Sequence, residues 1–142
     1  MGSSYNAGYI GAYYFENISK IQSQIINASE FIDSGKIINE KDLVIGITQS
    51  GETAETIKAL EYAKNKKAKT LAIVEKSVSQ ASIISDITVN IGSGPEYAVA
   101  STKTFTSTTI SLYIIAKYLL SKTQGKLLKL SLIHISEPTR PY

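Results

Sequence analysis

Short apolar strands that alternate with helical segments constrain the fold of this chain more than any other feature. Buried strands are predicted at Asp42–Ile47 and Lys69–Val74, a further strand at Asp86–Ile91, and a short one at Gln22–Ala28. Runs that are apolar along their length, rather than at every second residue, are typical of a parallel sheet covered by helices on both faces. We therefore predict an α/β fold, a three-layer sandwich around a parallel sheet.

Apolar residues at helical spacing predict the helices that would cover this sheet. The longest pattern spans Thr102–Leu120, others span Tyr5–Ile18 and Glu52–Lys66, and short helices are expected at Ser29–Phe31 and Ser77–Ile84. The stripe of the longest helix steps by three and four residues and comprises Phe105, Thr108, Leu112, Ile115 and Leu119. Ligands of such folds bind beyond the carboxyl ends of the strands, so the loops after Ile47 and Ile91 should share one edge.

Composition narrows the chemistry that the chain can perform. At 142 residues it is long enough for one domain, and it contains no cysteine. A disulfide framework, a thiol nucleophile and a thiolate metal site are therefore excluded, and we expect a reducing, cytoplasmic location. No metal-ligand constellation, Walker loop or Gly-x-Gly-x-x-Gly motif occurs, so we predict neither a cofactor nor a metal. No apolar run approaches the ~20 residues of a membrane span, so we expect no membrane partner.

One dense basic cluster comprises Lys64, Lys66, Lys67 and Lys69, in a chain of net charge +3. Such a cluster is either a patch for nucleic acid or another anion, or a set of cations that complements the C-terminus of a helix. No aromatic side chains interleave with these lysines, as a nucleic-acid surface requires. We favour the helix terminus and expect no nucleic-acid partner.

A loop rich in hydroxyl groups follows the strand Asp42–Ile47. It contains Thr48, Gln49, Ser50 and Thr53 around Gly51, and a helix is predicted to follow. Neutral side-chain donors and the first backbone N–H groups of a helix together favour an anion such as phosphate, and glycine lets the backbone approach it closely. The alternative is a helix cap made by Ser50, but a cap needs one hydroxyl and this loop offers three plus an amide. We interpret the loop as an anion site.

Two other polar segments precede helices. Ser3 and Ser4 form a second hydroxyl pair, which taken alone is best explained as a helix cap. In the segment Val99–Lys103, Ser101 or Thr102 can cap the longest helix. A lysine in the first turn is unfavourable for the helix dipole unless an anion is near, so Lys103 is either a sign of an anion or an ordinary exposed lysine.

Acid–base groups are scarce in this sequence. Glu96 could act as an acid or a base, but it has no partner carboxylate nearby in the sequence. His134 is the only histidine, and it lies in the C-terminal stretch. We therefore assign no catalytic residue.

Both ends of the chain depart from the pattern of the rest. Gly2–Tyr5 resembles a loop that follows a strand, and residues 131–142 have neither clean periodicity nor capping residues. We expect a fragment in which residues 1–122 form a domain without its first strand and residues 123–142 form a linker and a non-native tail. In a flavodoxin-like order, the missing strand would lie between Gln22–Ala28 and Asp42–Ile47.

Four segments together resemble the SIS (sugar isomerase) domain, in particular the first of the two such domains in glutamine–fructose-6-phosphate aminotransferases. These segments are Gly2–Tyr5, Ala28–Phe31, Thr48–Thr53 and Gly94–Thr106, and the resemblance extends over residues 2–122. It implies a flavodoxin-like fold and an enzyme that adds glutamine-derived ammonia to fructose 6-phosphate and isomerises the product to glucosamine 6-phosphate.

The resemblance also implies roles for particular residues. The phosphate would rest on Thr48, Gln49, Ser50 and Thr53, with Ser3 and Ser4 nearby, and Val99, Ala100 and Ser101 would line the sugar. Thr48 and Ser3 depart from the family's usual serine and threonine but keep the hydroxyl. The family's glutaminase half and second isomerase domain, which supply its catalytic groups, lie outside the resemblance. We therefore expect the fragment to be inactive alone and the full-length parent to form a homodimer.

Two alternatives stay open at this point. The chain resembles a stand-alone SIS module that senses a phosphosugar without chemistry, or part of a deaminase or deglycase with paired SIS domains. All three interpretations share a sugar phosphate as the small-molecule ligand.

Overall fold

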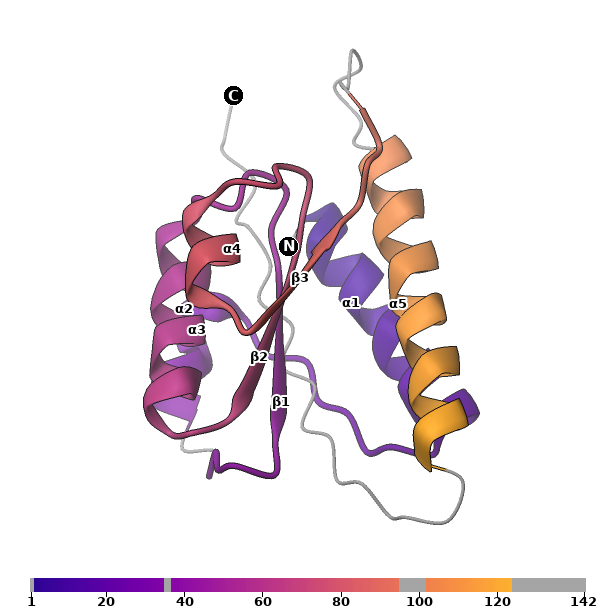
Figure 1. Ribbon diagram of the computed structural model, residues 1–142, viewed down its shortest axis with the longest axis horizontal. Coiled ribbons are helices and arrows are strands. Elements are labelled where there is room, and N and C mark those ends of the chain that lie inside the picture. Colours follow the sequence, from indigo (N-terminus) through magenta and orange to yellow (C-terminus); the bar gives the residue numbers. More distant parts are fainter. Residues whose placement is uncertain (1, 35–36, 95–101, 124–142) are drawn as a thin grey trace.

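A parallel sheet of three strands lies at the centre of the structure (Figure 1). The computed structural model describes residues 2–34, 37–94 and 102–123. Its strands are β1 (Leu43–Ile47), β2 (Lys69–Val74) and β3 (Ile87–Asn90), in the order β1-β2-β3. Both pairings are parallel, with Leu43 opposite Lys69 and Leu71 opposite Ile87. The predicted parallel sheet is confirmed.

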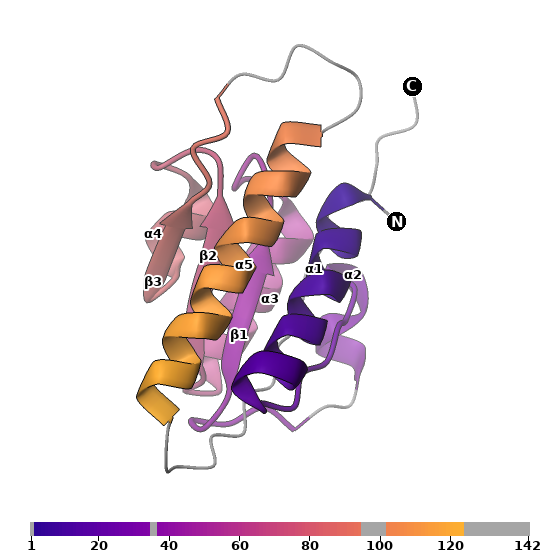
Figure 2. The same cartoon turned by 90° about the vertical axis from the view of Figure 1, so that its right-hand side faces the viewer.

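Helices cover both faces of the sheet and give the predicted three-layer sandwich (Figures 1 and 2). One face carries α1 (Ser3–Tyr14), its π-helical extension η1 (Phe15–Ser19) and α5 (Thr102–Thr123). The other carries α2 (Ala28–Phe31), which continues into the 3-10 turn η2 (Ile32–Ser34), together with α3 (Ala54–Asn65) and α4 (Gln80–Ile84). Each helix predicted from the sequence is present, with one or both of its ends shifted.

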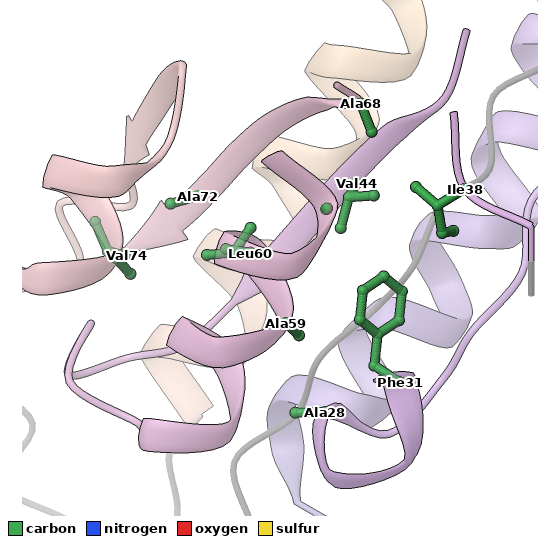
Figure 3. Close-up of a cluster of buried hydrophobic side chains, with 11 residues drawn as sticks. Ala28, Phe31, Ile38, Val44, Ala59, Leu60, Ala68, Ala72 and Val74 are labelled. Carbon is green, nitrogen blue, oxygen red and sulfur yellow. The ribbon is translucent and has the colours of Figure 1, made fainter. Parts of the chain in front are cut away.

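Successive side chains of β1 point to opposite faces, so each face of the sheet has its own apolar core. Val44 belongs to the cluster beneath α2, α3 and α4, which Figure 3 shows together with Leu60. Ile45 belongs to the cluster beneath α1, η1 and α5, together with Leu112. Gly46 allows α3 to approach, because a Cβ at this position would lie 2.9 Å from Leu60 Cδ1.

The buried face of α5 follows the predicted stripe in part. Thr108 and Leu112 are buried as expected. The fully buried positions of α5 recur every four residues, at Thr104, Thr108, Leu112 and Ala116. The other predicted members, Phe105, Ile115 and Leu119, are half-buried. Leu112 packs closely against α1 because Gly11 carries no side chain: a Cβ on Gly11 would lie 2.8 Å from Leu112 Cδ1.

The basic cluster lies where α3 ends, at the amino edge of the sheet. Lys64, in the last turn of α3, donates a hydrogen bond to the Ile84 carbonyl at 2.7 Å and lies 3.8 Å from Asp86 Oδ1. Asp86 accepts hydrogen bonds from the backbone N–H and the hydroxyl of Thr70, at 2.9 and 3.1 Å. The hydrogen bond from the Thr70 N–H is the main cause that lowers the pKa of Asp86 below its ordinary value. Lys64 therefore has the role at a helix terminus that the sequence indicates.

The predicted strand at Gln22–Ala28 is wrong. Residues 20–27 form no strand, and Ala28 begins α2. A strand needs a hydrogen-bonded neighbour, and across residues 2–34, 37–94 and 102–123 the sheet joins β1, β2 and β3 alone. β1 is thus an edge strand of the described sheet, although Val44 and Ile45 are both 0% exposed. Such burial is typical of a strand inside a parallel sheet, and the expected further strand beside β1 stays a prediction.

Candidate functional site

The loop between β1 and α3 brings two of its three hydroxyl groups, those of Thr48 and Thr53, close together. Thr48 is fully buried, and its Oγ1 lies 3.0 Å from Thr53 Oγ1 and accepts the Gly51 N–H at 3.2 Å. Ser50 Oγ accepts the Glu52 N–H at 3.1 Å. The N-cap of α3 is Thr53, so the alternative in which Ser50 caps this helix is wrong. The Thr48 and Thr53 hydroxyls therefore lie side by side at the start of α3, and Ser50 stabilises the turn that precedes this helix.

Gly51 is needed for the shape of this loop. Its φ of +72° lies in the left-handed region, and a Cβ there would collide with the side chain of Ser79. The loop is also held from the α4 side, because the Gly51 carbonyl accepts the Ala81 N–H at 2.9 Å and Glu52 Oε1 accepts the Gln80 N–H at 3.0 Å. These hydrogen bonds fix the shape of the loop in the absence of a ligand.

The N-termini of α1, α3 and α5 all lie at the carboxyl edge of the sheet (Figures 1 and 2). The structure places Ser3 and Ser4 in the first turn of α1, where Gly2 is the N-cap, so neither serine occupies the capping position. Lys103 is exposed in the first turn of α5. Each helix N-terminus carries roughly half a positive charge, so the fields of these helices add at this edge and favour an anion.

A closed circle of hydrogen bonds joins the loop to its neighbours; we call its members, Gln49, Glu75, Ser93 and Thr104, the edge network. The Glu75 carboxylate accepts the Ser93 N–H at 3.1 Å and the Ser93 hydroxyl at 2.7 Å. Ser93 Oγ lies 3.4 Å from Thr104 Oγ1, which accepts a hydrogen bond from Gln49 Nε2 at 3.2 Å. The Glu75 N–H donates to the Gln49 carbonyl at 3.1 Å and completes the circle.

Sequence reasoning identified Gln49 but missed the other three members of the edge network. A usable signal existed for Glu75, which directly follows β2 and so lies at the same edge as the hydroxyl loop. Ser93 follows β3 in the same way, between Gly92 and Gly94, which both have positive φ. Thr104 gave no signal beyond its place near the start of a helix.

Several predicted residues lie outside the part of the chain that the structure describes. They are Glu96, Val99, Ala100, Ser101 and His134. Their assignments stay predictions. Within the described ranges, no group of three or more acidic, histidine or cysteine side chains is arranged to hold a metal ion. The helices of those same ranges include none that is both long and apolar enough to cross a membrane.

The fold and the loop define an α/β domain with a candidate anion site at the carboxyl edge of a parallel sheet. The sequence profile of the SIS domain matches residues 1–118. The chain belongs to the SIS domain family.

Comparison with known proteins gives relatives in amino-sugar metabolism. The chain is 49% identical over 113 residues to a glutamine–fructose-6-phosphate aminotransferase of Methanococcus maripaludis, a match that covers 80% of this chain and 18% of the relative. The C-terminal domain of glucosamine-fructose-6-phosphate aminotransferase from Francisella tularensis superposes with a TM-score of 0.80 at 32% identity, over 89% of this chain and 36% of that one.

A solved structure of glucosamine-6-phosphate deaminase from Thermotoga maritima also matches, with a TM-score of 0.76 at 28% identity, over 84% of this chain and 38% of that one. The chain thus spans about a fifth of the curated aminotransferase and less than half of either solved structure.

Proposed function

We propose that this chain binds a phosphosugar, fructose 6-phosphate or glucosamine 6-phosphate, as the first isomerase domain of a glutamine-dependent fructose-6-phosphate aminotransferase. The observation that carries the proposal is the loop of residues 48–53, whose Thr48 and Thr53 hydroxyls lie 3.0 Å apart at the start of α3. The aminotransferase relatives support the choice of sugar phosphate, since they match this chain over 80% of its length.

Neutral donors perform the binding in this proposal. Gln49, Ser50 and Thr53 contact the phosphate, and the buried Thr48 supports them through its hydrogen bonds to Thr53 and to the Gly51 N–H. The first N–H groups of α3 point at the phosphate. Hydrogen bonds to a charged oxygen are roughly twice as strong as those between neutral groups, so a dianion is held without lysine, arginine or metal. Ser3 and Ser4 add hydroxyls from the start of α1.

The remaining assignments concern the sugar and the assembly. Val99, Ala100 and Ser101 line the sugar, and catalytic acid–base groups come from parts of the enzyme outside this chain. The chain alone then binds the sugar phosphate but does not catalyse its conversion, and its full-length parent is a homodimer. General acid–base catalysis needs a positioned group within hydrogen-bond reach of the transferred proton, and we assign none here.

A second candidate is one half of a glucosamine-6-phosphate deaminase with paired SIS domains. The specific observation in its favour is the fold match to the Thermotoga maritima deaminase at 28% identity. The upstream gene separates the two: a glutaminase domain with an N-terminal cysteine supports the aminotransferase, and its absence supports the deaminase.

Calorimetry with fructose 6-phosphate and with unphosphorylated fructose tests the binding proposal. We expect binding of the phosphate ester alone, and a Kd raised roughly tenfold to a hundredfold in Ser50→Ala, because one hydrogen bond to a charged group contributes about 1.5–3 kcal/mol.

Ser121→Ala is the matched control, because it removes an exposed hydroxyl in the last turns of α5 and should leave the Kd unchanged. Equal affinity for fructose and its phosphate ester would refute the phosphate assignment.

A further inference from the structure

Glu75 occupies a central position among the loops at the carboxyl edge. It is the first residue after β2, the middle strand of the described sheet. Its backbone N–H donates to the Gln49 carbonyl at 3.1 Å, and its own carbonyl accepts the Asn90 Nδ2 at 2.7 Å. The main chain of Glu75 therefore connects the loop after β1 with Asn90, the last residue of β3.

The Glu75 side chain holds the turn after β3. Oε2 accepts the N–H and the hydroxyl of Ser93, at 3.1 and 2.7 Å, and Oε1 accepts the Gly94 N–H at 3.0 Å. Gly92 and Gly94 have φ of +59° and +73°, and a turn with such residues presents consecutive N–H groups to one acceptor. The Glu75 carboxylate thus accepts hydrogen bonds from donors of Ser93 and Gly94 that would otherwise be available to an anionic ligand.

The carboxylate also sets the direction of every hydrogen bond between it and Gln49. An ionised carboxylate can only accept, so the single hydroxyl proton of Ser93 points to Glu75. Ser93 Oγ must then accept from the Thr104 hydroxyl, 3.4 Å away, and Thr104 Oγ1 is left to accept from Gln49 Nε2 at 3.2 Å. The Gln49 amide is therefore held with its nitrogen toward α5, beside the loop of residues 48–53.

We propose that Glu75 is a positioning residue for phosphosugar binding. It acts through Ser93 and Thr104 on the Gln49 amide and keeps this amide oriented as a donor for the phosphate ester. This role rests on the proposed function of the loop. It is not a direct contact, because a carboxylate would repel the dianion.

The direction in which Glu75→Gln changes the Kd for fructose 6-phosphate distinguishes this positioning role from a purely electrostatic effect. Glu75→Gln keeps the size of the side chain and removes a negative charge near the site. Loss of the Coulomb repulsion between this carboxylate and the phosphate would by itself tighten the binding of fructose 6-phosphate. Loss of positioning predicts weaker binding. The amide nitrogen of Gln at position 75 would face an N–H donor of the turn after β3, and the carboxylate that orients the hydrogen bonds of the edge network would be gone. We expect the Kd to rise about five- to tenfold, and by the same factor for inorganic phosphate.

A double-mutant cycle tests whether the effect passes through Gln49. In a Gln49→Ala background, Glu75→Gln should change the Kd by less than about twofold, because the group that it positions is already gone. A structural defect that loosens the whole domain would instead weaken binding in both backgrounds. Glu61→Gln, on the exposed side of α3, is the control for the change in net charge and should leave the Kd unaffected.

The outcomes are distinct. Unchanged or tighter binding in Glu75→Gln, or additive effects in the cycle, would overturn the positioning role while the phosphosugar site stands. Absence of fructose 6-phosphate binding by the unsubstituted chain would overturn the proposed function and this role with it. If Glu75→Gln fails to fold, Thr104→Val removes the acceptor of the Gln49 amide at nearly constant volume. It should raise the Kd by a similar factor, and an unchanged Kd there would likewise reject the proposal.

Discussion

Gly51 is the single residue on which the shape of the hydroxyl loop depends most. Its left-handed φ of +72° and its contact with Ser79 both disfavour a side chain. We expect Gly51→Ala to lower the free energy of unfolding by more than the ~1–3 kcal/mol that a non-glycine residue costs in that conformation, because the collision with Ser79 adds to it. It should also weaken phosphosugar binding, because the loop must shift to relieve the collision. Urea denaturation and calorimetry measure the two effects.

Gly94→Ala is the matched control for that experiment. Gly94 has nearly the same φ, +73°, but a Cβ there would meet no atom within 4 Å. The control therefore carries the conformational cost without the collision. Equal destabilisation by the two substitutions would show that the contact with Ser79 contributes nothing.

Residues close in sequence were the predictable part of the site. Thr48, Ser50 and Thr53 share one loop, so their clustering follows from the order of residues alone. The edge network could not be predicted in this way, since Gln49 and Thr104 lie 55 positions apart and no periodicity relates them. Such contacts arise from the way separate loops converge at the end of a sheet.

At the scale of elements, Asp86 joins the start of β3 to β2. Its pKa is lowered mainly by the hydrogen bond from the Thr70 N–H, with the Thr70 hydroxyl and Lys64 acting in the same direction and burial opposing. A group with a lowered folded-state pKa stabilises the native state above the unfolded pKa, about 3.9, and this contribution disappears as pH falls through the folded value. We expect Asp86→Asn to reduce the free energy of unfolding at pH 7 and the difference from the parent chain to shrink below about pH 3.9.

Urea denaturation at pH 7 and at pH 3 measures this difference. Glu61→Gln, which alters an exposed carboxylate of α3, should show little effect at either pH. A stability gap for Asp86→Asn that is the same at both pH values would contradict the assigned role of the ionised carboxylate.

Elements with strong local patterns were predicted well, and the weakest one was not. β2 was predicted with the bounds that the structure shows, because a continuous apolar run between two turns is a local signal. The segment Gln22–Ala28 has strand-like composition, but a strand exists only where a neighbour supplies backbone partners. No such neighbour occurs in the part of the chain that the structure describes.

For the whole molecule, ligand binding should appear as added stability. A ligand that binds the native state alone stabilises it by about 2.7 kcal/mol at a hundred times its Kd. For a domain of this size, that corresponds to a rise in Tm on the order of 10 °C. We expect this rise with fructose 6-phosphate, measured by circular dichroism, and none with fructose at the same concentration.

Inorganic phosphate gives the intermediate case in the same experiment. It occupies the loop without contacts to the sugar, so its shift at a given concentration should be smaller. An equal shift with fructose and fructose 6-phosphate would show that the loop does not recognise the ester.

The parallel α/β class and the hydroxyl loop could be predicted from the sequence alone, because both follow from the order of neighbouring residues. Apolar runs, helical spacing and a polar stretch after Ile47 need no knowledge of distant contacts. The contacts of Glu75 and Thr104, and the absence of a strand at Gln22–Ala28, are visible only in the folded structure. Each depends on which backbone and side-chain groups meet across long sequence separations, and packing of the whole domain settles that.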